Sequence, residues 1–260
     1  MLVGGPTTII ELGGLRLLTD PTFDPPGEYP IGDRTLTKTL GPSVPAGQLG
    51  RIDAVLLSHD QHPDNLDTAG RRLLGEVPLT VTTPAAAERL GAPALGLPPW
   101  RHTTLQRPNG SQLRITSVPA RHGPEGTEAA LGPVTGFVLS ADDLPSVYIS
   151  GDNASLQVVQ QVADNLSPID VAVLFAGAGR TTLFDAYLNL TSTQAVQAAQ
   201  LLNAPTAIVL HTEAWAHLTQ GPGTVKDAFD RQGEQHRLLT LRHAQWTDLW
   251  TRDLQAGATL

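Results

Sequence analysis

The sequence predicts an α+β fold in which two mixed β-sheets are flanked by helices. Short apolar runs rich in Val, Ile and Leu, bounded by turn residues, recur along the 260 residues and are typical of buried strands. In the second half of the chain these runs alternate with helical patterns, as in parallel β-α-β units. No linker, low-complexity tract or internal repeat divides the sequence. We therefore predict a single domain over residues 1–260.

Up to residue 150 the chain is predicted to consist mainly of strands. The glycine pair Gly13-Gly14 separates two apolar runs and predicts a hairpin. Six prolines between residues 21 and 50 exclude a long helix, so we expect an irregular, functional loop there. Thr83-Pro84 is typical of a helix start, with a capping hydroxyl before the proline. The strands predicted in this part cover residues 7–12, 15–19, 53–58, 78–82, 112–118, 134–140 and 146–150.

The second half is predicted to alternate strands and helices. Leu156, Val159 and Val162 recur at near-helical spacing and predict a helix over residues 155–166. Thr191 and Gln194 match a capping box, which predicts a helix that continues to residue 202. The remaining predictions are strands at 171–175 and 207–210, a last helix capped by Thr224, and a strand at 237–241.

Composition excludes several classes of protein. The net charge of −8 and the lack of Lys and Arg clusters disfavour nucleic-acid binding. The absence of cysteine excludes disulfides, thiolate metal ligands and a cysteine nucleophile. No segment approaches the roughly 18 apolar residues that span a bilayer, and the N-terminus lacks a secretion-signal pattern. We expect a cytoplasmic protein that acts on a small molecule and has no nucleic-acid or membrane partner. The sequence leaves open whether the protein forms a homo-oligomer.

Ionisable residues stand where several of the apolar runs end. Side chains at the same end of neighbouring strands converge on one edge of a sheet, where ligands bind. Imidazoles and carboxylates together suit a divalent transition metal. The sequence therefore predicts a metal site assembled from distant segments, and its candidate residues are Asp20, His59, His122, Asp152 and His211.

The densest group of such residues is the segment 58–67, which reads SHDQHPDNLD. It places two imidazoles and three carboxylates within nine residues, directly after an apolar run, and packing alone does not account for them. The alternative is a polar turn in which Asp64 or Asn65 caps a following helix.

These motifs together resemble the metallo-β-lactamase superfamily, in the branch similar to ascorbate-6-phosphate lactonase. The family motifs are an early Asp, a His-x-His-x-Asp-His loop, a lone His, a lone Asp and a final His. Matching positions occur in that order between about residues 7 and 220: Asp20, the loop His59–Asn65, His122, Asp152 and His211. The resemblance implies an αββα sandwich with one or two metal ions along one edge.

The resemblance also implies which residues hold the metal. One ion would be held by His59, His62 and His122, and a second by Asp64 and His211, with Asp152 between the two ions. Asp20 would orient the loop from outside the ligand set.

The loop departs from the family pattern in two ways. It is one residue longer, so Gln61 or His62 could stand at the second histidine, and we favour His62 because imidazole is the better ligand. Asn65 stands where the family has the last loop histidine. A neutral amide is a weak zinc ligand, so we expect the second ion to be loosely held or absent.

The expected activity is metal-dependent hydrolysis. The sequence contains no Gly-x-Ser-x-Gly elbow, Walker loop or Cys/His pair, which leaves metal-bound hydroxide as the nucleophile. Suitable substrates are a small ester, lactone, amide or phosphodiester. We expect Asp64 or Asp152 to orient the water or carry its proton, and His217 to donate a proton or contact substrate. Zinc is favoured as the metal, with manganese or iron as alternatives.

Other interpretations stay open at this point. An iron-dependent redox or dioxygenase enzyme on the same fold is one, and a non-catalytic metal or ligand binder is another, supported by Asn65 and the lengthened loop. Asp152 is also a candidate helix cap, and His211 a buried structural histidine. Exposed turn histidines are the alternative for His122 and His217. Residues 177–179 form either a tight turn or a ligand-binding loop, and Arg180 just after them is a candidate contact for an anionic substrate. The other histidines, His102, His236 and His243, are expected on the surface.

Overall fold

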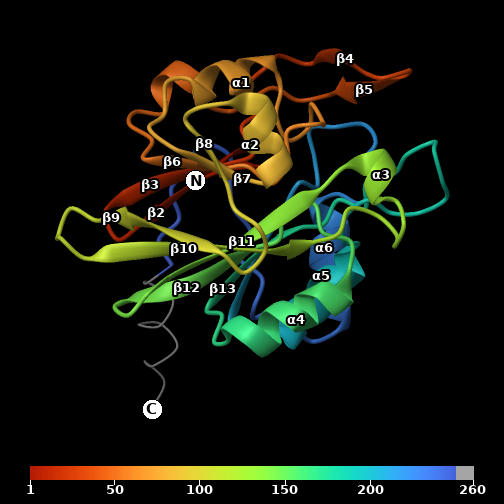
Figure 1. Ribbon diagram of the computed structural model, residues 1–260. Coiled ribbons are helices and arrows are strands. Elements are labelled where there is room, and N and C mark those ends of the chain that lie inside the picture. Colours follow the sequence, from red (N-terminus) through yellow and green to blue (C-terminus); the bar gives the residue numbers. More distant parts are fainter. Residues whose placement is uncertain (250–260) are drawn as a thin grey trace.

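Two six-stranded sheets pack face to face in the computed structural model, which describes residues 1–249 (Figure 1). In the first sheet the strand order is β1 (Leu2–Gly4), β2 (Thr7–Leu12), β3 (Leu15–Thr19), β6 (Ala54–Leu56), β7 (Thr80–Thr82) and β8 (Ala94–Gly96). In the second sheet it is β14 (Thr206–Leu210), β13 (Val171–Phe175), β12 (Leu144–Ile149), β11 (Val134–Ala141), β10 (Gln112–Ala120) and β9 (His102–Gln106).

Both sheets are mixed, and each contains a parallel part. Strands β3, β6, β7 and β8 are parallel neighbours in the first sheet, as are β12, β13 and β14 in the second. Strand β10 runs in the same direction as β12, because β11 between them is antiparallel to both. The carboxyl ends of these strands therefore come together at one rim of the sandwich.

Three apolar clusters separate the layers. Leu17, Leu56 and Phe175 belong to a cluster that fills the space between the two sheets. A second cluster joins the first sheet to α1 (Thr68–Leu74), near α2 (Pro84–Leu90). A third cluster joins the second sheet to three helices, α4 (Leu156–Leu166), α5 (Ser192–Leu201) and α6 (Pro222–Arg231). Figure 1 shows these helices on the two outer faces. The predicted αββα arrangement is confirmed.

Local sequence signals account for most helix starts. The Thr83 hydroxyl accepts a hydrogen bond from the Ala86 amide at 3.1 Å, directly before the proline that begins α2. In α5 the Thr191 hydroxyl accepts from the Gln194 amide at 3.2 Å, while the Gln194 side chain accepts from the Thr191 amide at 3.0 Å. The predicted capping box is therefore confirmed.

The expectation of an irregular segment between residues 21 and 50 was wrong in part. This segment contains a hairpin of β4 (Gly27–Ile31) and β5 (Arg34–Lys38) and a short 3₁₀ helix, η1 (Ala46–Gln48). Pro30 lies within β4 and does not prevent pairing, because a two-stranded ribbon has only edge strands, which tolerate proline.

Two predictions near the C-terminal end were also wrong. Helix α6 begins at Pro222 after Gly221, so Thr224 lies inside the helix and is not its cap; proline at the first helical position sets this start. Residues 237–241 form no strand. The turn before them ends at Arg237, and after it only Leu238 makes an isolated β-bridge, with Ala207. Short elements such as β1, β8, β9, α1 and α3 (Glu128–Leu131) were not predicted, because three to seven residues establish little periodicity.

No helix within residues 1–249 is long and apolar enough to cross a bilayer.

Replacing Thr191 by Ala should lower the free energy of unfolding by about 1 kcal/mol, because the first turn of α5 loses its side-chain cap. The matched control is Thr193→Ala, an exposed position in the same turn, which should change stability by less than about 0.5 kcal/mol. Equilibrium denaturation with urea measures both values. Equal effects of the two variants would contradict the role of the cap.

Candidate metal centre

The candidate residues lie at the rim where the parallel strands end. Asp20 follows β3 and His59 lies just beyond β6 in the first sheet, while residues 122, 152 and 211 follow β10, β12 and β14 in the second. All of these side chains are buried. The site is therefore formed where the two sheets meet, and each sheet contributes part of it.

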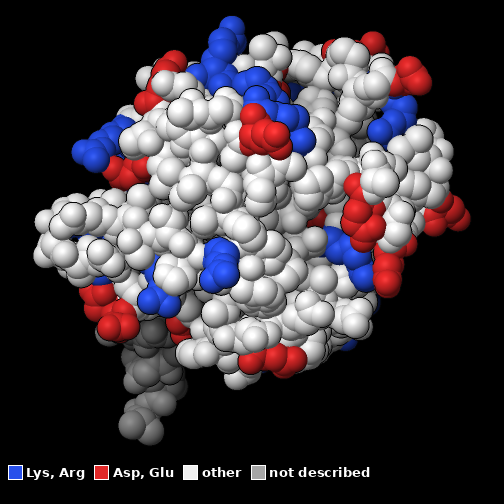
Figure 2. All heavy atoms as spheres, viewed as in Figure 1, with Lys and Arg blue, Asp and Glu red and all other residues white. Residues whose placement is uncertain are grey.

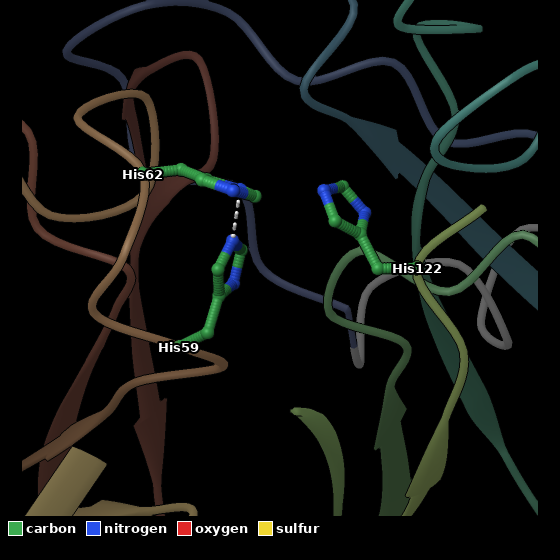
Figure 3. Close-up of side chains that lie close together, drawn as sticks. All are labelled: His59, His62 and His122. Carbon is green, nitrogen blue, oxygen red and sulfur yellow. Dashed lines mark hydrogen bonds between the residues drawn. The ribbon is translucent and has the colours of Figure 1, made fainter. Parts of the chain in front are cut away.

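One group of donors consists of three histidines, His59, His62 and His122 (Figure 3). His59 Nε2 lies 2.8 Å from His62 Nδ1, and the His122 ring centroid lies 5.3 and 5.0 Å from those of His59 and His62. The structure thus places His62 in the cluster. Gln61 instead packs against Gly132, so of the two residues weighed for this position it is His62 that faces the other imidazoles.

Burial keeps two of these histidines neutral, and a backbone carbonyl orients the third. His122 Nδ1 donates to the Leu188 carbonyl at 2.7 Å, because a carbonyl can only accept, which leaves Nε2 as the nitrogen that could bind a metal. Burial, together with the neighbouring imidazoles, lowers the pKa of His59 well below its ordinary value. Burial and His122 lower the pKa of His62 to about 4. Neutral imidazole is the form that coordinates a metal.

A second group combines Asp64, Asp152 and His211, whose donor atoms lie within 4.8 Å of one another. His211 Nε2 lies 3.3 Å from Asp64 Oδ2 and 3.7 Å from Asp152 Oδ1. His217 Nε2 also approaches Asp64 Oδ2, at 3.1 Å. His217, on the segment after β14, therefore lies beside this group.

Charge pairing controls the protonation of this second group. Burial acts to raise the pKa of Asp64, but His217 and His211 outweigh it, and the pKa lies well below its ordinary value. Burial acts to lower the pKa of His211, but Asp152 and Asp64 outweigh it, and the pKa is raised. Within residues 1–249 His211 Nδ1 and His122 Nε2 make no hydrogen bond, while His211 Nε2 has its contact with Asp64. Such unpartnered buried nitrogens fit a metal ligand, because burial without a partner is costly.

Asp20 and Asn65 lie beneath the two donor groups. Asp20 Oδ1 accepts a hydrogen bond from the Ser58 amide at 2.6 Å, and its Oδ2 accepts from Asn65 Nδ2 at 3.4 Å. Burial raises the pKa of Asp20 to about 7. Asp20 thus contacts the start of the loop rather than the donor groups, and Asn65 is turned toward Asp20.

Two supporting residues carried no signal in the sequence. The Leu188 carbonyl fixes the His122 tautomer, and the Asn189 side chain donates to Asp152 Oδ1 at 3.1 Å. Both precede the α5 capping box, where nothing in the local pattern distinguishes them from an ordinary strand-to-helix connection. Only the folded chain brings them to the site.

Backbone strain and close packing fix His211. Its φ of 55° lies in the left-handed region, which a residue with a side chain adopts at a cost and which is found most often at functional sites. A Cβ on Gly177 would lie only 2.1 Å from the His211 carbonyl oxygen. Gly177 thus allows a close backbone approach to His211.

Several alternative interpretations are wrong. Asp67, rather than Asp64 or Asn65, caps α1 through its Oδ1 and the Gly70 amide at 2.8 Å. The cap of α4 is Ser155, not Asp152. His102 and His236 are exposed as expected, but His243 is half-buried and pairs with Glu213, so its assignment as an isolated surface residue was wrong.

Residues of both donor groups line one cleft. His62, Asp64, His122, Asp152 and His217 form its polar floor. The walls come from segments remote in sequence, and they include Ile31, Arg34, Leu36, Leu131, Gly179, Arg180, Leu188 and Asn189.

Comparisons with known proteins agree with this architecture. A family model described as the beta-lactamase superfamily domain matches residues 15–212. A "UPF0173 metal-dependent hydrolase" of Methanosphaerula palustris is 29% identical over 186 residues, which cover 69% of this chain and 77% of the relative. The matched part spans only 46–56% of three Pyrococcus relatives with the same description.

Solved structures share the fold at low sequence identity. An isothiocyanate hydrolase from Delia radicum gut bacteria superimposes with a TM-score of 0.80 at 18% identity, over 96% of this chain and 98% of its own. A protein of Veillonella parvula described as a possible metal-dependent hydrolase gives 0.78 at 15% identity, over 94% and 96% of the two chains. At these identities the likeness concerns the fold alone.

Removing one histidine from either donor group should weaken metal binding at least about tenfold, because each group then lacks a donor. The variants are His59→Ala and His211→Ala, read out by elemental analysis after zinc loading and desalting. The exposed His102→Ala and His236→Ala should retain the wild-type metal content. Unchanged metal in both test variants would refute the assignment of the site.

Proposed function

The chain belongs to the beta-lactamase superfamily, and we propose that it is a metal-dependent hydrolase of a small ester, lactone, amide or phosphodiester. The observation that carries the proposal is the presence of two buried donor groups, each with residues that line one cleft. The description of the Methanosphaerula palustris relative as a metal-dependent hydrolase supports hydrolysis over the iron-dependent redox alternative.

In this proposal His59, His62 and His122 would hold one ion, and Asp64, Asp152 and His211 a second. Imidazole nitrogens combined with carboxylates favour zinc, with manganese or iron as alternatives. When bound, such a divalent ion polarises the attacked group and lowers the pKa of water from about 15.7 to about 7. The unpartnered nitrogens of His122 and His211 support this fit.

The chain's own residues would position the reactants and move protons. Asp64 and Asp152 face the cleft floor, where their carboxylates can orient a water molecule and accept its proton. His217 contacts Asp64 at 3.1 Å and lines the cleft, so it is placed to return a proton to the leaving group or to contact substrate.

Surface charge supports a small substrate rather than a nucleic acid. Figure 2 shows Lys and Arg side chains interspersed with Asp and Glu on the face it displays, without a broad basic surface. With a net charge of −8, the chain offers little attraction for a phosphate backbone.

The proposal predicts hydrolysis that depends on the metal. Purified protein should hydrolyse members of a panel of small esters, lactones and phosphodiesters, lose this activity on treatment with a chelator, and regain it with zinc or manganese. Asp64→Asn, Asp152→Asn and His217→Gln should each lower kcat about 100-fold, since each removes a group that handles a proton.

His236→Gln, at an exposed position, is the matched control and should retain full activity. Stoichiometric metal without turnover across the panel would instead favour a non-catalytic binder. Oxygen consumption by an iron-loaded protein would favour the redox alternative.

A further inference from the structure

The β4–β5 hairpin forms one wall of the cleft and is firmly anchored. Ile31, Arg34 and Leu36 from this hairpin line the cleft opposite the donor groups. At the base of the hairpin, the buried Lys38 ammonium lies 3.0 Å from Asp67 Oδ2, within the same segment that supplies His59 and His62. Figure 1 shows the hairpin projecting from the first-sheet half of the molecule.

Backbone hydrogen bonds attach the hairpin to the other half of the site as well. The Thr39 amide donates to the Ala214 carbonyl at 2.7 Å, and the Ala216 amide donates to the Thr37 carbonyl at 2.9 Å. Residue 217, which follows directly, is the histidine that contacts Asp64. The position of the hairpin over the cleft is therefore set by the same segments that carry the donor groups.

Arg34 is a half-buried guanidinium on this wall with no acidic partner. Its Nη1 donates to the Thr181 hydroxyl at 2.7 Å, and no carboxylate within residues 1–249 lies at ion-pair distance from it.

Arg180, which also lines the cleft, is exposed and has an acidic partner. It pairs with Asp185, and its guanidinium lies 5.3 Å from the Tyr187 ring centroid. Its charge is therefore already balanced by a carboxylate. Of the two arginines that line the cleft, Arg34 is the one available to an anionic ligand.

We propose that Arg34 binds an anionic group of the substrate, a carboxylate or a phosphate, while the bond to be cleaved faces the donor groups. This inference rests on the proposed hydrolase function and narrows its substrate class to small acids that carry a hydrolysable group. Guanidinium matches both anions with two parallel hydrogen bonds, and the bond to Thr181 holds it in orientation. Leu36, Leu131 and Leu188 provide an apolar surface for the body of such a substrate.

The test compares benzoate with benzamide, two ligands of nearly the same shape that differ in charge. Calorimetric titration of the zinc-loaded protein should show benzoate binding at least about tenfold more tightly than benzamide, the factor that one charge-assisted hydrogen bond supplies. Arg34→Gln should abolish this preference. Arg34→Lys retains the positive charge but cannot form two parallel hydrogen bonds, so its preference for benzoate should be intermediate. Arg180→Gln should keep the wild-type preference for benzoate.

Two outcomes would overturn the proposal. A preference for benzoate that persists in Arg34→Gln would mean that the carboxylate binds at the metal centre alone. Equal weakening of both ligands in Arg34→Gln would indicate a merely structural role for the residue.

The proposed hydrolase function is tested separately with phenyl acetate, a neutral ester. The wild-type protein should hydrolyse phenyl acetate whether or not Arg34 binds an anion, since this ester has no anionic group to be bound. Loss of the benzoate preference in a protein that hydrolyses nothing in the panel would leave the anion site standing and remove the proposed activity.

Discussion

The structure depends on the burial of imidazoles and carboxylates where two sheets meet. Buried ionisable groups are costly unless they are neutralised, paired or bound to a metal. The first donor group meets this constraint by staying neutral, as the lowered pKa values of His59 and His62 indicate. The second group meets it by pairing Asp64 with His211 and His217. Both arrangements leave donor atoms directed at a shared cleft.

Two residues of the site have strained backbone conformations. Asp20 and His211 both have positive φ angles, of 26° and 55°, in a region that residues with side chains rarely adopt. Gly177 allows the His211 backbone to approach closely, and the Leu188 carbonyl selects the His122 tautomer. Because these supports come from loops after different strands, the site and the sandwich form together, and a rigid core is a requirement for the chemistry.

The β4–β5 hairpin connects the shape of the cleft to the donor groups. Its base is fixed by the buried Lys38–Asp67 pair, and Asp67 also caps the helix that follows the histidine loop. A displacement of the hairpin would therefore disturb the loop, and the reverse also holds. The hairpin and the histidine loop therefore share one set of contacts. The long segment between residues 21 and 50, expected to be irregular, provides this connection as an ordered element.

The sequence by itself determined the alternation of strands and helices in the second half, the capping box at Thr191 and the family, because these depend on local periodicity and on motifs in order. It also predicted, by position at strand ends, the residues that the structure gathers: His59 and His211 are 152 positions apart, yet both lie at one rim. Only the tertiary structure decided that His62 rather than Gln61 joins the cluster, that Asn65 turns toward Asp20, and that His217 faces Asp64. The physical reason is that side-chain direction in an irregular loop is set by contacts with distant segments, which no local pattern encodes. The same reason kept Arg34 and Asn189 out of the sequence prediction, since each acquires its role from partners more than 30 residues away.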